Sequence, residues 1–484
     1  MTFFDPQTWS GRYFDGTWAG GSATAPVTSP STGEVIGHVA VGTVDDLDRT
    51  VHAARRAQME WAATPAEHRA AVMRRAAAII EENTDTLARW LSDEAGSAQG
   101  KAHFEAGLVA NEFHLAAATA MMPYGQLLRS ARPRLSLSRR RPVGVVGVIS
   151  PFNFPGILSA RSIAPALALG NAVVLKPDPR TSVSGGLFFA AALEEAGVPA
   201  GVFSVLPGGI EVGSALVDHP AVPVISFTGS TEAGRVIGAR AGELLKRAHL
   251  ELGGNNALVV LDGVDIAAAA SAGAWGSFLH QGQICMTTGR HLVHESIYDE
   301  YVARLSAKAA ALPAGDPSSG APLGPIIDER QRDKIDAIVR ETVDAGARLT
   351  AGGQYDGLFY EATVLAEVTP DHAAFQKEIF GPVAPVTRFG SIDELVELVY
   401  ASEYGLSLGI LAKDAYRAYE LADRLPSGIL HINDQTVDDE SQAPFGGVGA
   451  SGTGARFGGH EANIEAFTET QWVTMQADVA TYPF

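Results

Sequence analysis

Three side chains in this sequence have the chemistry needed to attack a carbonyl carbon and then hydrolyse the product. Cys285 lies in GQICMTTGR, and a thiolate adds readily to an aldehyde or ester carbon when its pKa is lowered and an oxyanion donor is close. Glu251 lies in ELGGNN, where apolar neighbours favour a raised carboxyl pKa and general-base catalysis. Asn153, in the turn PFNFP, offers an amide donor. Each residue alone also has an ordinary explanation, as a buried thiol, a surface carboxylate or a turn residue.

A second set of residues could hold a phosphate group. TGSTEAG, at Thr228–Gly234, follows the apolar run PVISF and leads into a helix expected near Thr231, where free backbone N–H groups attract an anion. An ordinary capped helix would give the same pattern. Lys176 ends another apolar run and could reach a ribose hydroxyl or a phosphate. GVGASG, at Gly447–Gly452, matches GxGxxG literally, but no strand precedes it and no helix opens on it, so we interpret it as a loop lining the substrate site.

The segments around these residues alternate between short apolar strands and helices. Helices are predicted over Ala160–Ala168 and Val183–Ala196, and a second α/β stretch follows from Ala257 to about Ala412. This alternation predicts a mostly parallel sheet covered on both faces, with ligands at the carboxyl ends of its strands. The strands of the first stretch are predicted at Val143–Ser150, Asn171–Lys176, Val202–Leu206 and Pro223–Phe227.

Helices are also predicted before this sheet. Thr43 and Asp46 form a capping-box pattern for a helix reaching about Ala63. Thr64-Pro65-Ala66-Glu67 predicts a cap, a proline at the first helical position and an acid in the first turn, for a helix running to Gly96. A third helix is expected over Lys101–Ala120. The segment RSARPRLSLSRRRP, ending at Pro142, alternates like a strand with one wet face; a nucleic-acid arm is the less favoured interpretation.

Composition limits the class of protein. The 484 residues predict two or three domains, and a hydrophobic fraction of 46% allows a large buried core. The formal charge of −19 argues against nucleic-acid and anionic-membrane partners. With Cys285 as the one cysteine, disulfides within the chain and cysteine metal clusters are excluded, and no metal site is predicted. The sequence has no signal-peptide pattern and no long apolar run, so a cytoplasmic, soluble protein is expected.

Taken together, the motifs PFNFP, LKP, FTGSTEAGR, ELGGNN, GQICMTTGR, EIFGPV and PFGGVGASG resemble the NAD(P)-dependent aldehyde dehydrogenase superfamily in order and spacing. The resemblance implies an α/β fold with two Rossmann-like parallel-sheet domains and a small β oligomerisation element. It places an NAD(P)-binding domain at residues 1–121 and 142–252 and a catalytic domain at 253–464. Residues 122–141 and 465–484 would form the oligomerisation element of a homodimer or homotetramer.

By this resemblance, Cys285 is the nucleophile that forms a thiohemiacetal and, after hydride transfer, a thioester. Asn153 donates to the developing oxyanion together with the backbone N–H of Cys285. Glu251 activates the water that releases the carboxylic acid. Many relatives carry a glutamate for proton relay where this sequence has Arg456, so the acceptor of the proton from Glu251 must differ here.

The resemblance also assigns cofactor residues, with NAD as the expected cofactor. NAD-preferring relatives often carry a glutamate three residues after the ribose-binding lysine; here Pro179 occupies that position and Arg180 follows, which leaves NADP possible. The residues that would contact the cofactor are Ser150, Lys176, Gly229, Ser230, Gly234, Leu252, Glu378 and Phe380.

The substrate class rests on a narrower resemblance, to the branch that oxidises benzaldehyde, vanillin and related aromatic aldehydes. Benzaldehyde is favoured over vanillin. An apolar pocket containing two phenylalanines suits a flat ring, and Arg161 could meet a ring hydroxyl or pair with a nearby acid. The residues expected to line the pocket are Phe154, Leu158, Arg161, Ile284, Met286 and Phe445.

Three alternatives remain open. A CoA-acylating aldehyde dehydrogenase usually lacks the hydrolytic glutamate, whereas Glu251 is present here. A semialdehyde dehydrogenase would need a basic group for a substrate carboxylate, for which Arg161 and Arg456 are the candidates. A non-enzymatic protein on this fold would be expected to lose Cys285 or Glu251, and both are retained.

Overall fold

Short runs of buried β-branched residues form a seven-stranded sheet in the first half of the chain. The computed structural model describes residues 3–484, and every residue of β7 and β8 is buried, because helices cover both faces of this sheet. β11, β10, β7, β8 and β9 run parallel, and β1 and β2 extend the edge by antiparallel pairing. In spatial order the strands are β11 (Arg247–Glu251), β10 (Val224–Thr228), β7 (Val145–Ile149), β8 (Ala172–Lys176), β9 (Phe203–Val205), β1 (Arg12–Phe14) and β2 (Trp18–Gly20).

Alternate residues of each strand enter two separate cores. Val146 and Val148 of β7 pack into the core on one face, and Val145 and Ile149 pack into the core on the other. One face is covered by α3 (Ala66–Glu82), α4 (Thr84–Ala95), α5 (Gln99–Thr119), α6 (Pro155–Ala168) and α7 (Phe188–Ala196). The other is covered by α2 (Val44–Ala63), α8 (Ile210–Asp218) and α9 (Thr231–Glu243).

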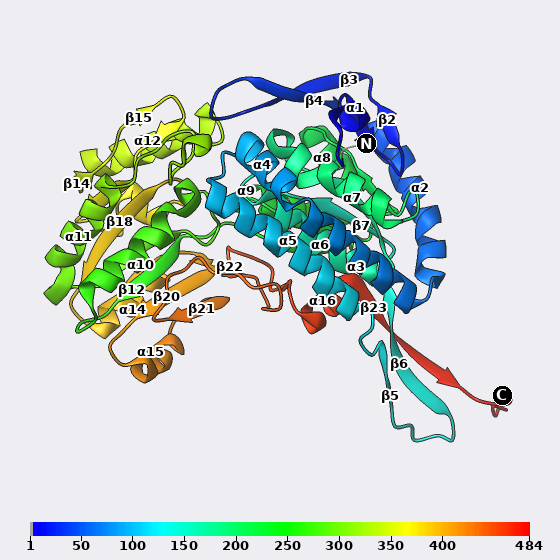
Figure 1. Cartoon of the computed structure of the whole chain (residues 1–484). Coiled ribbons are helices and arrows are strands. Elements are labelled where there is room, and N and C mark those ends of the chain that lie inside the picture. The colour runs from blue at the N-terminus through cyan, green and yellow to red at the C-terminus, as the bar shows by residue number, and fades with distance from the viewer. Residues whose placement is uncertain (1–2) are drawn as a thin grey trace.

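The second half of the chain repeats this plan with another seven-stranded sheet, and the two halves lie side by side (Figure 1). Its strands are β14 (Arg348–Ala351), β17 (Thr363–Ala366), β18 (Val383–Phe389), β13 (Thr288–His294), β12 (Asn256–Val260), β20 (Ser407–Leu411) and β21 (Ile429–Ile432). All pairings are parallel except that of β14 with β17. The covering helices are α10 (Ile266–Phe278) and α11 (Tyr298–Ala310) on one face, and α12 (Glu329–Asp344), α13 (Ala373–Gln376), α14 (Ile392–Tyr400) and α15 (Ala415–Ala422) on the other.

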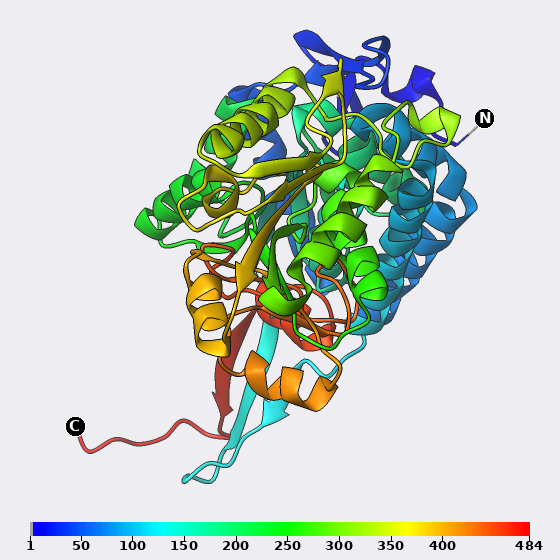
Figure 2. The same cartoon turned by 90° about the vertical axis from the view of Figure 1, so that its left-hand side faces the viewer.

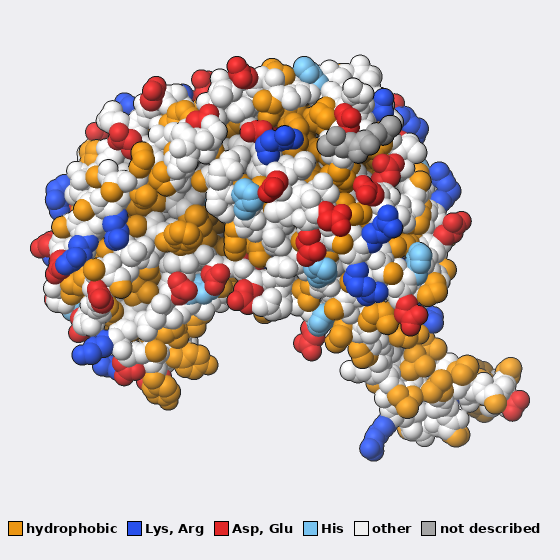
Figure 3. Space-filling model, in the orientation of Figure 1, with side chains coloured by type: hydrophobic (Ala, Val, Ile, Leu, Met, Phe, Trp, Pro, Cys, Tyr) orange, Lys and Arg blue, Asp and Glu red, His pale blue; other side chains and the backbone are white. Residues whose placement is uncertain are grey.

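A three-stranded antiparallel sheet projects from the first half and forms an arm (Figures 1 and 2). The arm consists of β5 (Gly125–Leu127), β6 (Leu135–Pro142) and β23 (Thr468–Met475), so it joins the predicted arginine-rich strand to the end of the chain. Apolar side chains gather on its surface (Figure 3), and the exposed fractions of Leu127 and Trp472 are 77% and 64%. The arm therefore exposes large apolar side chains of the kind that usually meet a partner.

The smaller elements complete the chain. A hairpin of β3 (Ala23–Thr28) and β4 (Val35–Val41) lies near the N-terminus, and α16 (His460–Phe467) precedes the last strand of the arm. The others are α1 (Pro6–Trp9), the pair β15 (Tyr355–Asp356) and β16 (Phe359–Tyr360), and the pair β19 (Tyr404–Gly405) and β22 (Val448–Gly449). Within residues 3–484, no helix is both long and apolar enough to cross a bilayer.

The predicted capping box is confirmed, since Thr43 accepts from the Asp46 N–H and Asp46 accepts from the Thr43 N–H. The predicted Thr64 cap is wrong, because extended Pro65 occupies the N-cap position and makes no side-chain cap. The single helix predicted to reach Gly96 is also wrong: it breaks at Asn83, whose amide donates to the Ile79 carbonyl at 2.8 Å.

Two further boundaries differ from the predicted helices. α6 begins at Pro155 rather than Ala160, because proline is favoured in the first helical turn. The first turn of the helix predicted from Val183 is π-helical, and α7 follows from Phe188.

Candidate active site

The two halves bring the predicted catalytic side chains to one region. Glu251 is the last residue of β11, and Asn153 lies in the loop between β7 and α6, so both occupy the carboxyl edge of the first sheet. Cys285 comes from the second half, in the loop before β13. Its thiol contacts the apolar cluster that includes Phe154, and its charge interacts with that of Glu251.

The loop that carries Cys285 is anchored from both sides. His280, Gln281 and Gly282 take consecutive left-handed conformations, with φ of 50°, 53° and 66°, which turn the chain sharply after α10. The Asn256 amide donates to the carbonyls of Cys285 and Thr287, each at 2.8 Å. This network fixes the loop backbone while the cysteine itself stays partly exposed.

The thiol of Cys285 is protonated in this environment. Although the residue as a whole is partly exposed, its thiol is buried; this burial, together with the charges of Glu378 and Glu251, raises the pKa of Cys285 to about 12, and Arg161 opposes the rise. Because the thiolate is the reactive form, the site needs a base to remove this proton.

Glu251 has the properties of such a base. Its carboxylate is buried and, within the part of the chain that the structure describes, neither oxygen has a hydrogen-bond partner. Burial raises its pKa well above the ordinary value, and the charges of Arg456 and Arg161 act in the opposite direction. Gly446 makes room for the carboxylate, since a Cβ at that position would lie 2.8 Å from Glu251 Oε1.

Asn153 is buried, yet among residues 3–484 its side-chain amide makes no hydrogen bond. Its backbone carbonyl accepts from Lys101 Nζ at 2.9 Å, and Pro155 starts α6 two residues later. The side-chain N–H groups are thus free to donate to a ligand oxygen.

The predicted cofactor residues line the same sheet edge. Lys176 ends β8 and is buried beneath the first turn of α8, and burial lowers its pKa. Ser230 is the N-cap of α9 and accepts from the Ala233 N–H at 3.3 Å. Ser150 Oγ is buried without a partner in the described chain, and Gly229 follows β10.

These residues fit a dinucleotide on two structural grounds. A Cβ on Gly234 would lie 2.3 Å from Leu252, so glycine lets the start of α9 approach the end of β11 closely. The free N–H groups at the start of the 13-residue helix α9 suit an anion. The Ser150 hydroxyl, which has no partner in the described chain, offers a further polar contact. The set therefore matches a ligand that carries both phosphate and hydroxyl groups.

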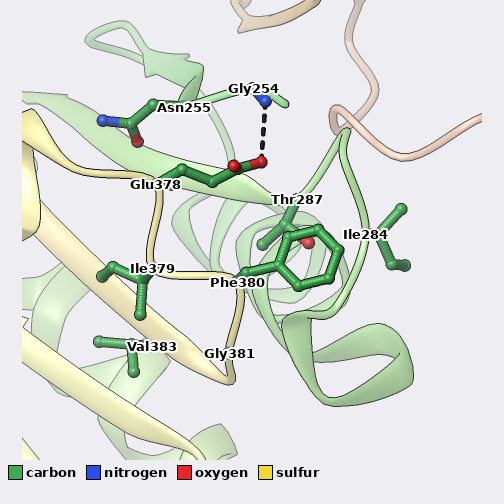
Figure 4. Close-up of a pocket in the computed structure, with 10 residues that line it drawn as sticks. Gly254, Asn255, Ile284, Thr287, Glu378, Ile379, Phe380, Gly381 and Val383 are labelled. Atoms are coloured by element: carbon green, nitrogen blue, oxygen red, sulfur yellow. Dashed lines mark hydrogen bonds between the residues drawn. The ribbon is translucent and has the colours of Figure 1, made fainter. Parts of the chain in front are cut away.

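A small cavity lies beside the cysteine loop (Figure 4). Glu378 lies in its wall and accepts from the Gly254 N–H at 2.9 Å, and burial raises the pKa of Glu378 to about 6. Phe380, in a left-handed conformation with φ of 58°, directs its ring toward the loop (Figure 4). The cavity is lined by Gly254, Asn255, Ile284, Thr287, Gly289, Glu378, Ile379, Phe380, Gly381 and Val383.

An apolar cluster surrounds the thiol, and it contains most of the predicted substrate pocket. Its buried members include Ile284, Met286 and Phe445, and Phe154 packs against them. Leu158 instead belongs to the helix core of the first sheet. Leu406 and Val437, which were not predicted, join the cluster from non-strand segments far along the chain, and no local sequence pattern marks them.

Arg161 is almost fully buried and pairs with the carboxylate of Asp439. Its Nε lies 3.6 Å from Glu112 Oε1, and its guanidinium stacks 4.6 Å from the centre of the Phe445 ring. Nε and Nη1 have no hydrogen-bond partner within residues 3–484. Asp439 and Glu112 were not predicted, because they approach Arg161 only through tertiary packing.

Arg180 does not face an open cofactor site. Its guanidinium bonds to Asp178 and to Asp328 at 2.6 Å, and it stacks over the Phe152 ring at 4.1 Å. Glu211, in the first turn of α8, instead brings a negative charge toward Lys176. Asp178, two residues after Lys176, also brings a negative charge toward it.

Comparison with known proteins identifies the class. The profile of the aldehyde dehydrogenase family matches residues 18–473, so this chain belongs to that family, as the motifs predict. It is 59% identical to vanillin dehydrogenase of an Amycolatopsis species over the whole of both chains. It is 48% identical to benzaldehyde dehydrogenase [NAD(+)] of Pseudomonas putida, over 98% of each chain.

The fold of the family is also shared with solved structures. Salicylaldehyde dehydrogenase from Pseudomonas putida G7, solved with salicylaldehyde, superposes with a TM-score of 0.94 at 35% identity, covering 98% of this chain and 99% of that one. The predicted fold class, an α/β protein with two parallel sheets, is therefore confirmed.

Proposed function

We propose that this aldehyde dehydrogenase oxidises an aromatic aldehyde to the carboxylic acid with NAD, using Cys285 as nucleophile. The observation that carries the proposal is that the chain's one thiol packs against an apolar cluster containing Phe154 and Phe445 and interacts with the unpaired, buried carboxylate of Glu251. The names of relatives at 59% and 48% identity support the aromatic substrate.

In the first step Glu251 accepts the proton of Cys285, directly or through water, and the thiolate sulfur bonds to the aldehyde carbon. The amide of Asn153 and the N–H of Cys285 donate to the oxygen that becomes negative. A donor of this kind contributes roughly 10²–10³ in rate. Loss of hydride from the thiohemiacetal leaves a thioester on Cys285, and Glu251 passes the proton it took from the thiol to solvent. Its carboxylate then removes a proton from the water that attacks the thioester carbon, and the carbon–sulfur bond breaks to release the carboxylic acid while the sulfur regains a proton.

The cofactor, when bound, supplies the hydride acceptor. Lys176 and Glu378 would hold its two riboses, and Gly229, Ser230 and Gly234 would hold the pyrophosphate. Ser150, Leu252 and Phe380 would complete the groove. NAD is the proposed cofactor because Glu211 lies near Lys176, where a 2′-phosphate would meet a like charge.

Benzaldehyde and vanillin are the two candidate substrates, with the ring between Phe154 and Phe445. The unpaired N–H groups of Arg161 favour a ring that carries an oxygen substituent, since a buried donor gains most from a new acceptor. A semialdehyde is disfavoured because Asp439 neutralises Arg161. A CoA-acylating reaction is disfavoured because Glu251 is present.

We further propose that residues 1–121 and 142–252 form the cofactor domain, residues 253–464 the catalytic domain, and the arm a subunit contact in a homodimer or homotetramer. Exposed Leu127, Trp472 and Met475 on the arm support this contact. We place the enzyme in the cytoplasm, where a catalytic thiol stays reduced.

The test is initial rates with benzaldehyde, vanillin, succinic semialdehyde and hexanal, each with NAD and with NADP. We expect kcat/KM for the aromatic aldehydes to exceed that for the others by at least tenfold. A preference for the aliphatic or acidic substrate would refute the substrate assignment while leaving the chemistry intact.

Two variants test the chemistry. Cys285→Ser should abolish oxidation while cofactor affinity persists. Retained turnover would show that Cys285 is not the nucleophile. Glu251→Gln removes the base from both steps, so NADH should form slowly and at most once per subunit, and the acyl-enzyme should accumulate, which mass spectrometry would detect. Steady turnover at the parent rate would contradict its role.

A further inference from the structure

A buried ion pair on α5 holds the segment that carries Asn153. Lys101 and Glu105 lie one helical turn apart, and their side chains are 1% and 0% exposed. Glu105 Oε2 accepts from Lys101 Nζ, and Ser97 Oγ accepts a second bond from the same ammonium group at 3.0 Å. Neither charge touches solvent, so each depends on the other for its stability.

The Lys101–Glu105 pair forms hydrogen bonds to the segment around Asn153 from both of its side chains. Lys101 Nζ donates to the Asn153 carbonyl at 2.9 Å. Glu105 Oε1 accepts from the Gly156 N–H at 2.8 Å and the Ile157 N–H at 3.2 Å, at the start of α6. α6 has no side-chain cap of its own, so a carboxylate from another helix replaces it.

Two neighbouring features depend on the same pair. Lys101 Nζ lies 3.9 Å from the centre of the Phe154 ring, which in turn packs edge-on against His280 of the cysteine loop. Gly156 allows the carboxylate to approach, since a Cβ there would lie 3.1 Å from Glu105 Oε1. The pair therefore orients both the proposed oxyanion donor and one wall of the proposed pocket.

We propose that Lys101 and Glu105 are positioning residues for the reaction, which act by fixing the Asn153 amide where the oxyanion develops. The inference rests on the proposed function, because it requires Asn153 to act as the oxyanion donor. A displacement of about 1 Å in such a group can cost on the order of 10² in rate, whereas the cofactor groove, built from β8, β10 and α9, does not use this contact.

The test variant is Lys101→Met combined with Glu105→Gln, which removes both charges together and retains an oxygen for the α6 N–H groups. We expect single-turnover NADH formation to slow by roughly 10- to 100-fold, with the cofactor Kd unchanged. The matched control is Glu94→Gln: Glu94 is another fully buried carboxylate, which accepts from the Val183 and Ser184 N–H groups and makes no hydrogen bond to residues 153–157. An equal loss of rate in this control would overturn the proposal.

A double-mutant cycle separates positioning from general disturbance. In an Asn153→Ala background, the Lys101→Met and Glu105→Gln changes should slow single-turnover NADH formation by less than about threefold, since the amide that the pair positions is absent. Fully additive losses would overturn the proposal. If Asn153→Ala alone leaves the single-turnover rate intact, the proposed role of Asn153 fails instead.

Gly156→Ala provides a second route if the double variant does not fold. Its methyl group would displace the Glu105 carboxylate without removing any charge. We expect a several-fold slower single turnover, again absent in the Asn153→Ala background. An unchanged rate in a folded Gly156→Ala protein, judged by thermal unfolding, would refute the positioning role.

Discussion

Arg456 sets the pH at which Glu251 can act as a base, and replacing it with methionine should move the acidic limb of the kcat profile to higher pH. A Cβ on Gly446 would lie 2.8 Å from Glu251 Oε1 and 2.9 Å from Arg456 Cδ, so the two side chains approach to within about 6 Å. At that distance and an effective dielectric constant of about 20, Coulomb's law gives about 3 kcal/mol. Arg456 is half-buried and its charge lies beyond Cδ, so we expect solvent screening to leave about half of this energy.

The sign follows from the charge that is removed. Burial already raises the pKa of Glu251, and Arg456 opposes that rise. Arg456→Met removes the opposing charge, so the pKa of Glu251 rises and less of the carboxylate is ionised at a given acidic pH. The assay is kcat between pH 5 and 10 with a saturating aromatic aldehyde. For Arg456→Met we expect turnover about tenfold slower than the parent's at pH values below the acidic limb, and an unchanged plateau above it. Arg456→Lys keeps the positive charge, so its acidic limb should lie close to that of the parent. An unmoved limb in a folded Arg456→Met protein would refute the reasoning.

Two other predictions concern the cofactor site and stability. Glu211→Gln should raise the ratio of kcat/KM with NADP to that with NAD by roughly tenfold, because a negative charge near the 2′-phosphate is lost; an unchanged ratio would show that Glu211 does not select the cofactor. Burial raises the pKa of Glu94 to about 7. The folded state therefore holds a proton that the unfolded state releases between about pH 4.5 and 7, and the free energy of unfolding falls as pH rises through this window. Glu94→Gln should reduce that fall by roughly 3 kcal/mol, as urea unfolding at pH 5 and 8 would measure; an equal fall in parent and variant would argue against it.

The sequence was most informative where local pattern decides structure. β7, β8 and β9 lie within the predicted strands, and β10 passes the end of its predicted strand by one residue, because buried parallel strands need continuous apolar runs. The break at Asn83 was missed since the apolar periodicity continues through it. The Asn83 backbone leaves the helical conformation, with φ of −118° and ψ of 22°, and the Asn83 amide and Thr84 hydroxyl bond to carbonyls of the preceding turn.

For the site, the sequence predicted the side chains but not their neighbours. Motif order was enough to propose Cys285, Glu251 and Asn153. Their environment is set by residues far away along the chain. Asp439 pairs with Arg161 across 278 residues, and Lys101 donates to the Asn153 carbonyl across 52 residues. A single sequence carries no signal for contacts between residues so far apart. The charge pairs inside the site could therefore be identified only from the folded structure.

The bonds of Arg180 also have a mechanical consequence. Asp178 follows the end of β8 in the first half, and Asp328 is the N-cap of α12 in the second, so one guanidinium links the two halves of the molecule. Any outward rotation of one half from the other must stretch or break this link. Because Arg180 and Asp328 are partly exposed, dissolved salt weakens the attraction between them. Rising ionic strength should therefore make it easier for the two halves to move apart at this point, even though no bond of Arg180 reaches the thiol.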